Sequence, residues 1–199
     1  MALIVQRQIV PDVLIGVWKV EETQQELLVR YPYLQSVAER FRNPRRRLEK
    51  LSVYALLHAL LPDEPFLSIS HNPDGKPLLD KWNISISDTK GYVAVMLSRS
   101  HRVGIDVEYQ SDRVSRIASR FLRADELFSD APSQLVVWCS KEAFYKCFSE
   151  QHLEYADMRA LSLPLGQSGM LEMQNMRTDE VCSVAYFFQT DFVLAFLYC

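Results

Sequence analysis

The chain has 199 residues, of which 48% are hydrophobic, and its 22 basic and 25 acidic side chains give a net charge of −3. This length allows one large domain or two small ones, and the apolar share is typical of a globular protein. No run approaches the roughly 20 apolar residues that a membrane span needs, and residues 1–10 lack the layout of a signal peptide. We therefore expect a soluble, cytoplasmic protein with no membrane partner.

The small net charge hides two unlike parts of the chain. Residues 1–123 carry 18 basic and 14 acidic groups, whereas residues 124–199 carry 4 and 11. Five arginines fall between positions 40 and 47, and arginine suits bidentate recognition of phosphate or carboxylate. A solvated helix face would explain the same cluster and stays open as the alternative. Nucleic acid is not expected as a partner, because the rest of the chain is not basic.

The first half of the chain predicts a strand hairpin, then helices, then further strands. Short apolar runs indicate paired strands at residues 2–9 and 12–20. Helical spacing follows over residues 23–41, and Asn43-Pro44 is a favourable start for a second helix that reaches residue 61. The remaining expected elements are a strand at 66–70, a turn at 72–75, a short segment at 76–79, and strands at 82–87 and 91–98.

The second half repeats the order of helices followed by strands. A strand is expected at residues 103–108 and a long amphipathic helix at 132–148. Shorter helices are expected at 114–122 and 124–128, and strands at 160–165, 170–173, 181–189 and 191–198. Each half ends in a pair of strands with a long apolar run, which hints at a duplicated α+β unit.

The four cysteines are expected to be reduced, buried thiols. Cys139, Cys147, Cys182 and Cys199 form no CxxC pair and show no zinc-binding spacing. Small disulfide-bonded domains are far denser in cysteine than this chain.

Two acidic residues follow a strand-like run at Gly104. Asp106 and Glu108 are two positions apart, so on a strand both carboxylates face the same side. Like charges this close repel each other unless a cation lies between them, and oxygen ligands suit Mg²⁺. The alternative is an ordinary polar strand end.

A second motif lies on the long helix at residues 132–148. Trp138, Glu142 and Lys146 recur every four residues and therefore form one stripe of the helix. Glu142 could complete a three-carboxylate metal site or act as a base, and Lys146 could hold a phosphate. The alternative is a simple Glu–Lys surface pair.

Together these motifs closely resemble the 4′-phosphopantetheinyl transferase superfamily, in the longer, surfactin-synthetase-activating type. The resemblance rests on residues 104–108 (GIDVE) and on Trp138-x-x-Lys141-Glu142-Ala143-x-x-Lys146, and it extends to residues 75–77, 83–87 and 120–126. It implies an α+β fold of two pseudo-twofold halves, here residues 1–101 and 102–199, with the active site between them. Because such a duplicated chain can build its site alone, we expect a monomer.

The resemblance also implies a reaction and its participants. The 4′-phosphopantetheine arm of coenzyme A would pass to a serine hydroxyl of an apo acyl or peptidyl carrier protein, with release of 3′,5′-ADP. Asp106, Glu108 and Glu142 would bind Mg²⁺. Lys146 would stabilise the leaving group. Glu142 would be the base, with Glu126 as a second candidate. The residues expected along the nucleotide are Arg46, Arg47, Lys50, Lys76, Pro77, Ser87 and Lys146.

Two departures from the family pattern keep an alternative open. Asp88 stands where the family usually has a histidine, and Tyr54 stands where it commonly has an arginine. An ionised aspartate repels phosphate, whereas a histidine can donate a hydrogen bond to it. The alternative is a catalytically degenerate relative that binds a carrier protein or a nucleotide without turnover.

Overall fold

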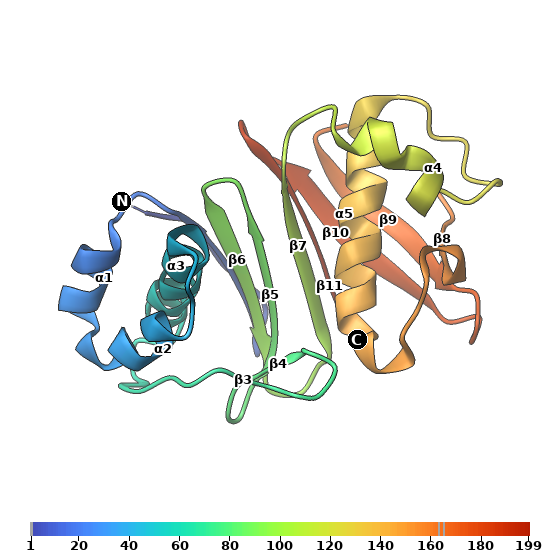
Figure 1. Cartoon of the computed structure of the whole chain (residues 1–199). Helices are drawn as coiled ribbons and strands as arrows, with labels where there is room; N and C mark the ends of the chain where they lie inside the picture. Colours follow the sequence, from blue (N-terminus) through green and yellow to red (C-terminus); the bar gives the residue numbers. More distant parts are fainter. Residues whose placement is uncertain (1, 163, 165) are drawn as a thin grey trace. The chain divides into compact units, whose positions relative to one another are not determined.

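The computed structural model describes residues 2–162, 164 and 166–199, which divide into two compact units, Met1–Ser100 and His101–Cys199. Each unit is a mixed α+β structure with its own antiparallel sheet, its own helices and its own buried core (Figure 1). The α+β class expected from the sequence is therefore the class that the chain adopts. None of the helices in the described part of the chain is long and apolar enough to cross a membrane.

The first unit contains a four-stranded sheet in the order β1-β2-β6-β5. The hairpin expected at the start of the chain is present. The strands are β1 (Leu3–Val10), β2 (Val13–Lys19), β5 (Asn83–Thr89) and β6 (Tyr92–Ser98), and a separate short pair consists of β3 (Ser70–His71) and β4 (Pro77–Leu78).

Three helices accompany this sheet: α1 (Gln24–Arg30), α2 (Gln35–Glu39) and α3 (Pro44–Leu60). The helical stretch expected over residues 23–41 is interrupted by a 3₁₀ turn at Pro32–Leu34. Helix α3 begins as expected, because the Asn43 side chain accepts hydrogen bonds from the backbone amides of Arg45 and Arg46. Leu51, Leu56 and their apolar neighbours pack this helix against β2 and β6. The arginine-rich first turns of α3 are therefore fixed over one edge of the sheet core.

The second unit contains a five-stranded antiparallel sheet in the order β7-β11-β10-β9-β8. Helix α5 (Ala131–Cys147) packs across it against β7 and β11 (Figure 1). Its start is fixed by Asp130, whose side chain accepts a hydrogen bond from Ser133 N, with Pro132 in the first turn. The remaining elements are α4 (Ala118–Phe121), β7 (Val103–Tyr109), β8 (Met158–Ala160), β9 (Ser168–Asn175), β10 (Val181–Phe188) and β11 (Phe192–Tyr198).

Four expected elements differ from the structure. Only Ser70 of the expected strand 66–70 is in a strand, because Ile69 N donates to the Tyr54 hydroxyl instead of joining a sheet. The expected helix 124–128 is irregular, because the buried Glu126 carboxylate accepts a hydrogen bond from the distant backbone amide of Ala160. Residues 114–122 are a 3₁₀ turn followed by the short α4. Of the expected strand 160–165, Ala160 ends β8 and residues 163 and 165 lie outside the described residues.

Candidate active site

The two acidic positions of β7 lie directly against helix α5, because Gly104 allows the two backbones to come together. A Cβ atom at Gly104 would lie 2.0 Å from the Ala143 carbonyl oxygen of α5, so no larger residue fits without moving the helix. The glycine of the GIDVE motif therefore sets the distance between the strand that carries Asp106 and Glu108 and the helix that carries Glu142 and Lys146.

Each of the three candidate metal ligands has a defined partner. Lys146 Nζ lies 2.6 Å from Asp106 Oδ1 and also donates to the Ile105 carbonyl oxygen at 3.1 Å. Trp138 Nε1 donates to Glu108 Oε1 at 2.9 Å. The helical stripe expected from the sequence is therefore the part of α5 that faces the acidic strand.

The third carboxylate, Glu142, has a partner from outside both motifs. The Tyr155 hydroxyl donates to Glu142 Oε1 at 2.6 Å. Its ring packs 5.5 Å from that of Trp138, centroid to centroid. The two side chains that orient Glu108 and Glu142 therefore support each other. Tyr155 had no signal in the sequence, because it lies in a single 3₁₀ turn, Tyr155–Asp157, which is too short to leave a periodic pattern.

The electrostatics of this cluster indicate an excess of negative charge. Burial raises the pKa of Glu108, and repulsion from Asp106 raises it further. Burial likewise raises the pKa of Glu142, against the opposing effect of the Tyr155 hydrogen bond. Burial alone would lower the pKa of Lys146, but attraction to Asp106 raises it overall. The cluster therefore contains one lysine and three carboxylates, and the pKa values of two of them, Glu108 and Glu142, are raised.

The donor set fits a divalent cation that prefers oxygen. Mg²⁺ usually takes one or two carboxylates directly and keeps several waters, so it does not need all three side chains as direct ligands. In the described part of the chain, the carboxylate oxygens of Asp106, Glu108 and Glu142 do not all lie within 4.8 Å of one another. Each carboxylate is held by a different partner, so the arrangement suits a partly hydrated ion better than a closed three-carboxylate cage.

Glu142 also lines a cavity of about 530 Å³ within the second unit. Its walls combine apolar side chains with one cation, Arg120. The other lining residues include Tyr145, Leu153, Tyr155 and Met158. The cavity therefore offers a reactant direct access to the carboxylate that was expected to act as the base.

Glu126, the second candidate base, has a different environment. Its side chain is 1% exposed and lies 2.7 Å from Lys141 Nζ. Its two oxygens also accept hydrogen bonds from the backbone amides of Arg123 (2.8 Å) and Ala160 (2.6 Å). This geometry is typical of a structural ion pair that fixes a loop. Lys141, which belongs to the motif on α5, therefore serves the fold of this unit.

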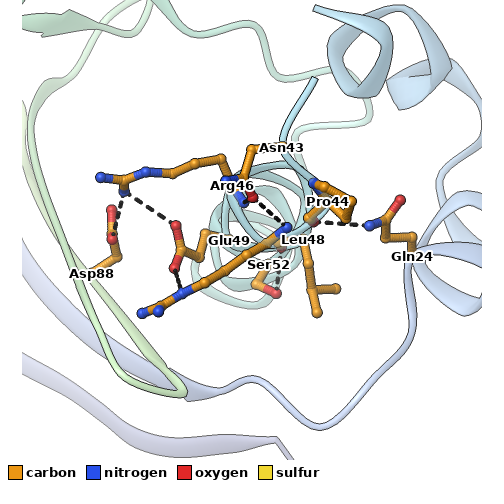
Figure 2. Close-up of polar contacts among 9 residues, drawn as sticks. Gln24, Asn43, Pro44, Arg46, Leu48, Glu49, Ser52 and Asp88 are labelled. Atoms are coloured by element: carbon orange, nitrogen blue, oxygen red, sulfur yellow. Dashed lines mark hydrogen bonds and ion pairs between the residues drawn. The ribbon is translucent and has the colours of Figure 1, made fainter. Parts of the chain in front are cut away.

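Apart from Lys146, the candidate nucleotide residues lie in the first unit, where Arg46 and Arg47 already have partners. Arg46 Nη1 lies 3.1 Å from Glu49 Oε2 and 3.0 Å from Asp88 Oδ2, as Figure 2 shows. Arg47 donates to the Phe41 carbonyl oxygen at 2.9 Å. Asp88 therefore binds one of the arginines that we expected to contact phosphate.

Lys50 lines a cavity of about 160 Å³ beside α3. Arg40, one of the five clustered arginines, and His71 line the same cavity. Tyr54 forms part of its wall, is 4% exposed, and accepts a hydrogen bond from Ile69 N at 3.0 Å. The tyrosine found in place of a family arginine therefore holds the wall of a cavity that combines aromatic and cationic side chains.

The structure does not bring the other nucleotide residues to this cavity. Pro77 begins β4, and Lys76 precedes it in a turn in which the Asn72 side chain accepts from Lys76 N at 2.8 Å. Ser87 is buried on β5, where alternation places it on the face opposite Asp88. Asp88 contacts α3 through Arg46, so Ser87 faces away from that helix.

Comparison with models of known protein families gives one match. Residues 102–197, nearly all of the second unit, match the family model of the 4′-phosphopantetheinyl transferase superfamily. No curated protein sequence matches the chain. This similarity covers the part of the chain that carries Asp106, Glu108, Glu142 and Lys146.

Proposed function

We propose that this chain, whose second unit is similar to the 4′-phosphopantetheinyl transferase superfamily, transfers the 4′-phosphopantetheine arm of coenzyme A to a serine of an apo carrier protein. The observation that carries the proposal is the arrangement of Asp106, Glu108, Glu142 and Lys146 between β7 and α5, within the matched residues. In this reaction the serine Oγ–P bond forms, and the P–O bond to 3′,5′-ADP breaks.

The side chains can be assigned roles in that reaction. Glu142 takes the serine proton, because burial raises its pKa and makes it a stronger base, and because it lines an accessible cavity. Lys146 leaves Asp106 and neutralises the charge that develops on the departing phosphate. Tyr155 and Trp138 orient the carboxylates. A bound Mg²⁺, held by Asp106, Glu108 and Glu142, would supply charge neutralisation for the pyrophosphate.

The test is transfer to several apo carrier proteins, with Mg²⁺ and coenzyme A, followed by the intact mass of each carrier. We expect at least one carrier to gain the mass of one arm. Glu142→Gln should slow this gain by about 10²- to 10⁴-fold, the usual effect of losing a general base. Glu172→Gln, on β9, is the matched control and should transfer at the wild-type rate. No mass gain on any carrier would refute the proposal.

The Arg46–Asp88 contact favours a second candidate, a relative that binds a carrier or a nucleotide without turnover. While Asp88 holds Arg46, that guanidinium is less available to a phosphate. Calorimetry with coenzyme A and with apo carriers separates the two functions, because carrier binding without a coenzyme A signal supports only the second. Asp88→His should remove one of the two carboxylates that hold Arg46 and tighten coenzyme A binding by about tenfold, equivalent to roughly 1.4 kcal/mol. Unchanged affinity would show that Arg46 does not contact the nucleotide.

A further inference from the structure

Three of the four cysteines gather at one edge of the second unit, away from the acidic residues of β7. Cys147 ends α5, Cys182 lies near the start of β10, and Cys199 follows β11. The Sγ atom of Cys199 lies 3.5 Å from that of Cys182 and 3.9 Å from that of Cys147. Cys147 is buried, but Cys182 and Cys199 are only half-buried, so the expectation of four buried thiols is wrong for two of them.

The sheet holds these sulfur atoms in place. Cys199 N donates to Arg102 O at 3.0 Å, and Arg102 N donates to Cys199 O at 2.9 Å, so Cys199 continues the β7–β11 ladder. The β10–β11 register pairs Ala185 with Phe196, and continuing it by three residues places Cys182 opposite Cys199. The thiols therefore come together through strand pairing, which explains why their spacing in the sequence showed no metal motif.

A carboxylate completes a possible set of donors. Glu180 Oε1 lies 3.8 Å from Cys182 Sγ. One donor atom from each of Glu180, Cys182 and Cys199 lies within 4.8 Å of the others. Arg102 Nη2 lies 3.4 Å from Glu180 Oε1, and its guanidinium packs on the Phe148 ring. A carboxylate braced by an arginine in this way resembles the hydrogen-bonded outer partners that orient metal ligands.

We propose that Cys147, Cys182, Cys199 and Glu180 form a Zn²⁺ site. Four-coordinate zinc bonds sulfur at about 2.3 Å, so neighbouring sulfur atoms of its tetrahedron are about 3.8 Å apart. The two sulfur–sulfur distances from Cys199, 3.5 and 3.9 Å, lie on either side of that value. Cys147 is not in the described group whose donor atoms lie within 4.8 Å of one another, so its Sγ has to move toward the other donors when the ion binds. Thiolates are the ligands that select zinc over the hard, oxygen-preferring cations. The proposed site is therefore chemically distinct from the carboxylate cluster on β7 and α5.

The test uses the full chain with an N-terminal tag, purified under a phosphine reductant and stripped of metal. Zinc is titrated against a chromogenic chelator, and bound zinc is counted by elemental analysis after desalting. We expect one zinc per chain. Co²⁺ should produce the thiolate charge-transfer band and the intense visible bands of a tetrahedral site.

The variants assign the site to its residues. Cys182→Ala and Cys199→Ala should each weaken zinc binding by at least the roughly 10- to 100-fold typical of changes around a metal site. Cys139→Ala, which removes a thiol outside the cluster, should bind zinc as the wild type does. Far-ultraviolet circular dichroism establishes that each variant is folded.

Three outcomes would overturn the proposal. The first is a wild-type chain that binds no stoichiometric zinc. The second is a folded Cys182→Ala/Cys199→Ala double variant that binds zinc as tightly as the wild type. The third is a Co²⁺ spectrum without thiolate bands. Formation of a Cys182–Cys199 disulfide with no zinc uptake after re-reduction would likewise show that these thiols form a redox pair.

Discussion

The buried Lys141–Glu126 pair gives the sharpest prediction about the stability of the second unit. Lys141 and Glu126 are 0% and 1% exposed at their side chains. Lys141→Met keeps a side chain of similar length but leaves the Glu126 carboxylate buried without its cation. The change acts on the fold, because neither residue faces the acidic cluster that holds Asp106.

The expected loss follows from the hydrogen bonds at Lys141 Nζ. Two of them are short, 2.7 Å to Glu126 Oε2 and 2.7 Å to Phe121 O. At roughly 1.5–3 kcal/mol for each bond to a charged group, they amount to about 3–6 kcal/mol. Breaking a buried pair by removing one partner typically costs about 3–5 kcal/mol, in agreement with this range. We therefore expect Lys141→Met to lose about 4 kcal/mol of unfolding free energy.

Urea denaturation measures this loss. With a denaturant slope of about 1–3 kcal/mol/M, the midpoint should fall by roughly 1–4 M. Fluorescence reports on the three tryptophans, of which Trp138 lies in the second unit, and circular dichroism reports on the whole chain. The double variant Lys141→Met/Glu126→Gln removes both charges but keeps a side-chain oxygen for a backbone amide, so it should recover part of the loss. A midpoint shift below about 0.5 M, or a double variant that is less stable than either single one, would refute the reasoning.

Three further predictions follow from single contacts. Gly104→Ala forces a methyl group against the Ala143 carbonyl and should cost at least about 1–3 kcal/mol, measured by the urea midpoint; an unchanged midpoint would contradict the close approach. Tyr155→Phe removes a hydrogen bond that lowers the pKa of Glu142, so in the transfer assay the acidic limb of the rate–pH profile should move to higher pH, with kcat falling more than KM rises. Burial lowers the pKa of His58, so below pH 6.5 the unfolded chain binds more protons than the folded chain, and the free energy of unfolding should fall as the pH falls. His58→Gln should reduce that fall. Urea midpoints on both sides of pH 6.5 measure it.

Local patterns predicted most of the regular structure. The helix cap at Asn43 and the alternation of side chains around Asp106 depend only on neighbouring residues, so the start of α3 and the strand β7 could be predicted from the sequence. The two segments that were predicted wrongly, residues 66–70 and 124–128, are held by long-range hydrogen bonds, from Ile69 N to the Tyr54 hydroxyl and from Ala160 N to Glu126. Such bonds override local propensity, and one sequence contains no record of them.

The candidate site divides in the same way. The motif residues on β7 and α5 come together because they lie on one strand and one helix stripe. The Arg46–Asp88 pair spans 42 positions, and Tyr155 reaches Glu142 from a short 3₁₀ turn, so neither contact leaves a periodic signal. Both contacts involve a predicted site residue. The sequence identified these residues but did not indicate which side chains they contact.

The ion pair between Lys146 and Asp106 has a consequence for how ligands would bind. While Lys146 occupies Asp106 Oδ1, a divalent cation has to compete with the ammonium group for that oxygen. Once displaced, the ammonium group is available to a phosphate. By thermodynamic linkage, the cation and a phosphate-bearing substrate would each raise the affinity for the other. Lys146, which pairs with Asp106 when no ligand is bound, would therefore couple the binding of the cation to the binding of the phosphate.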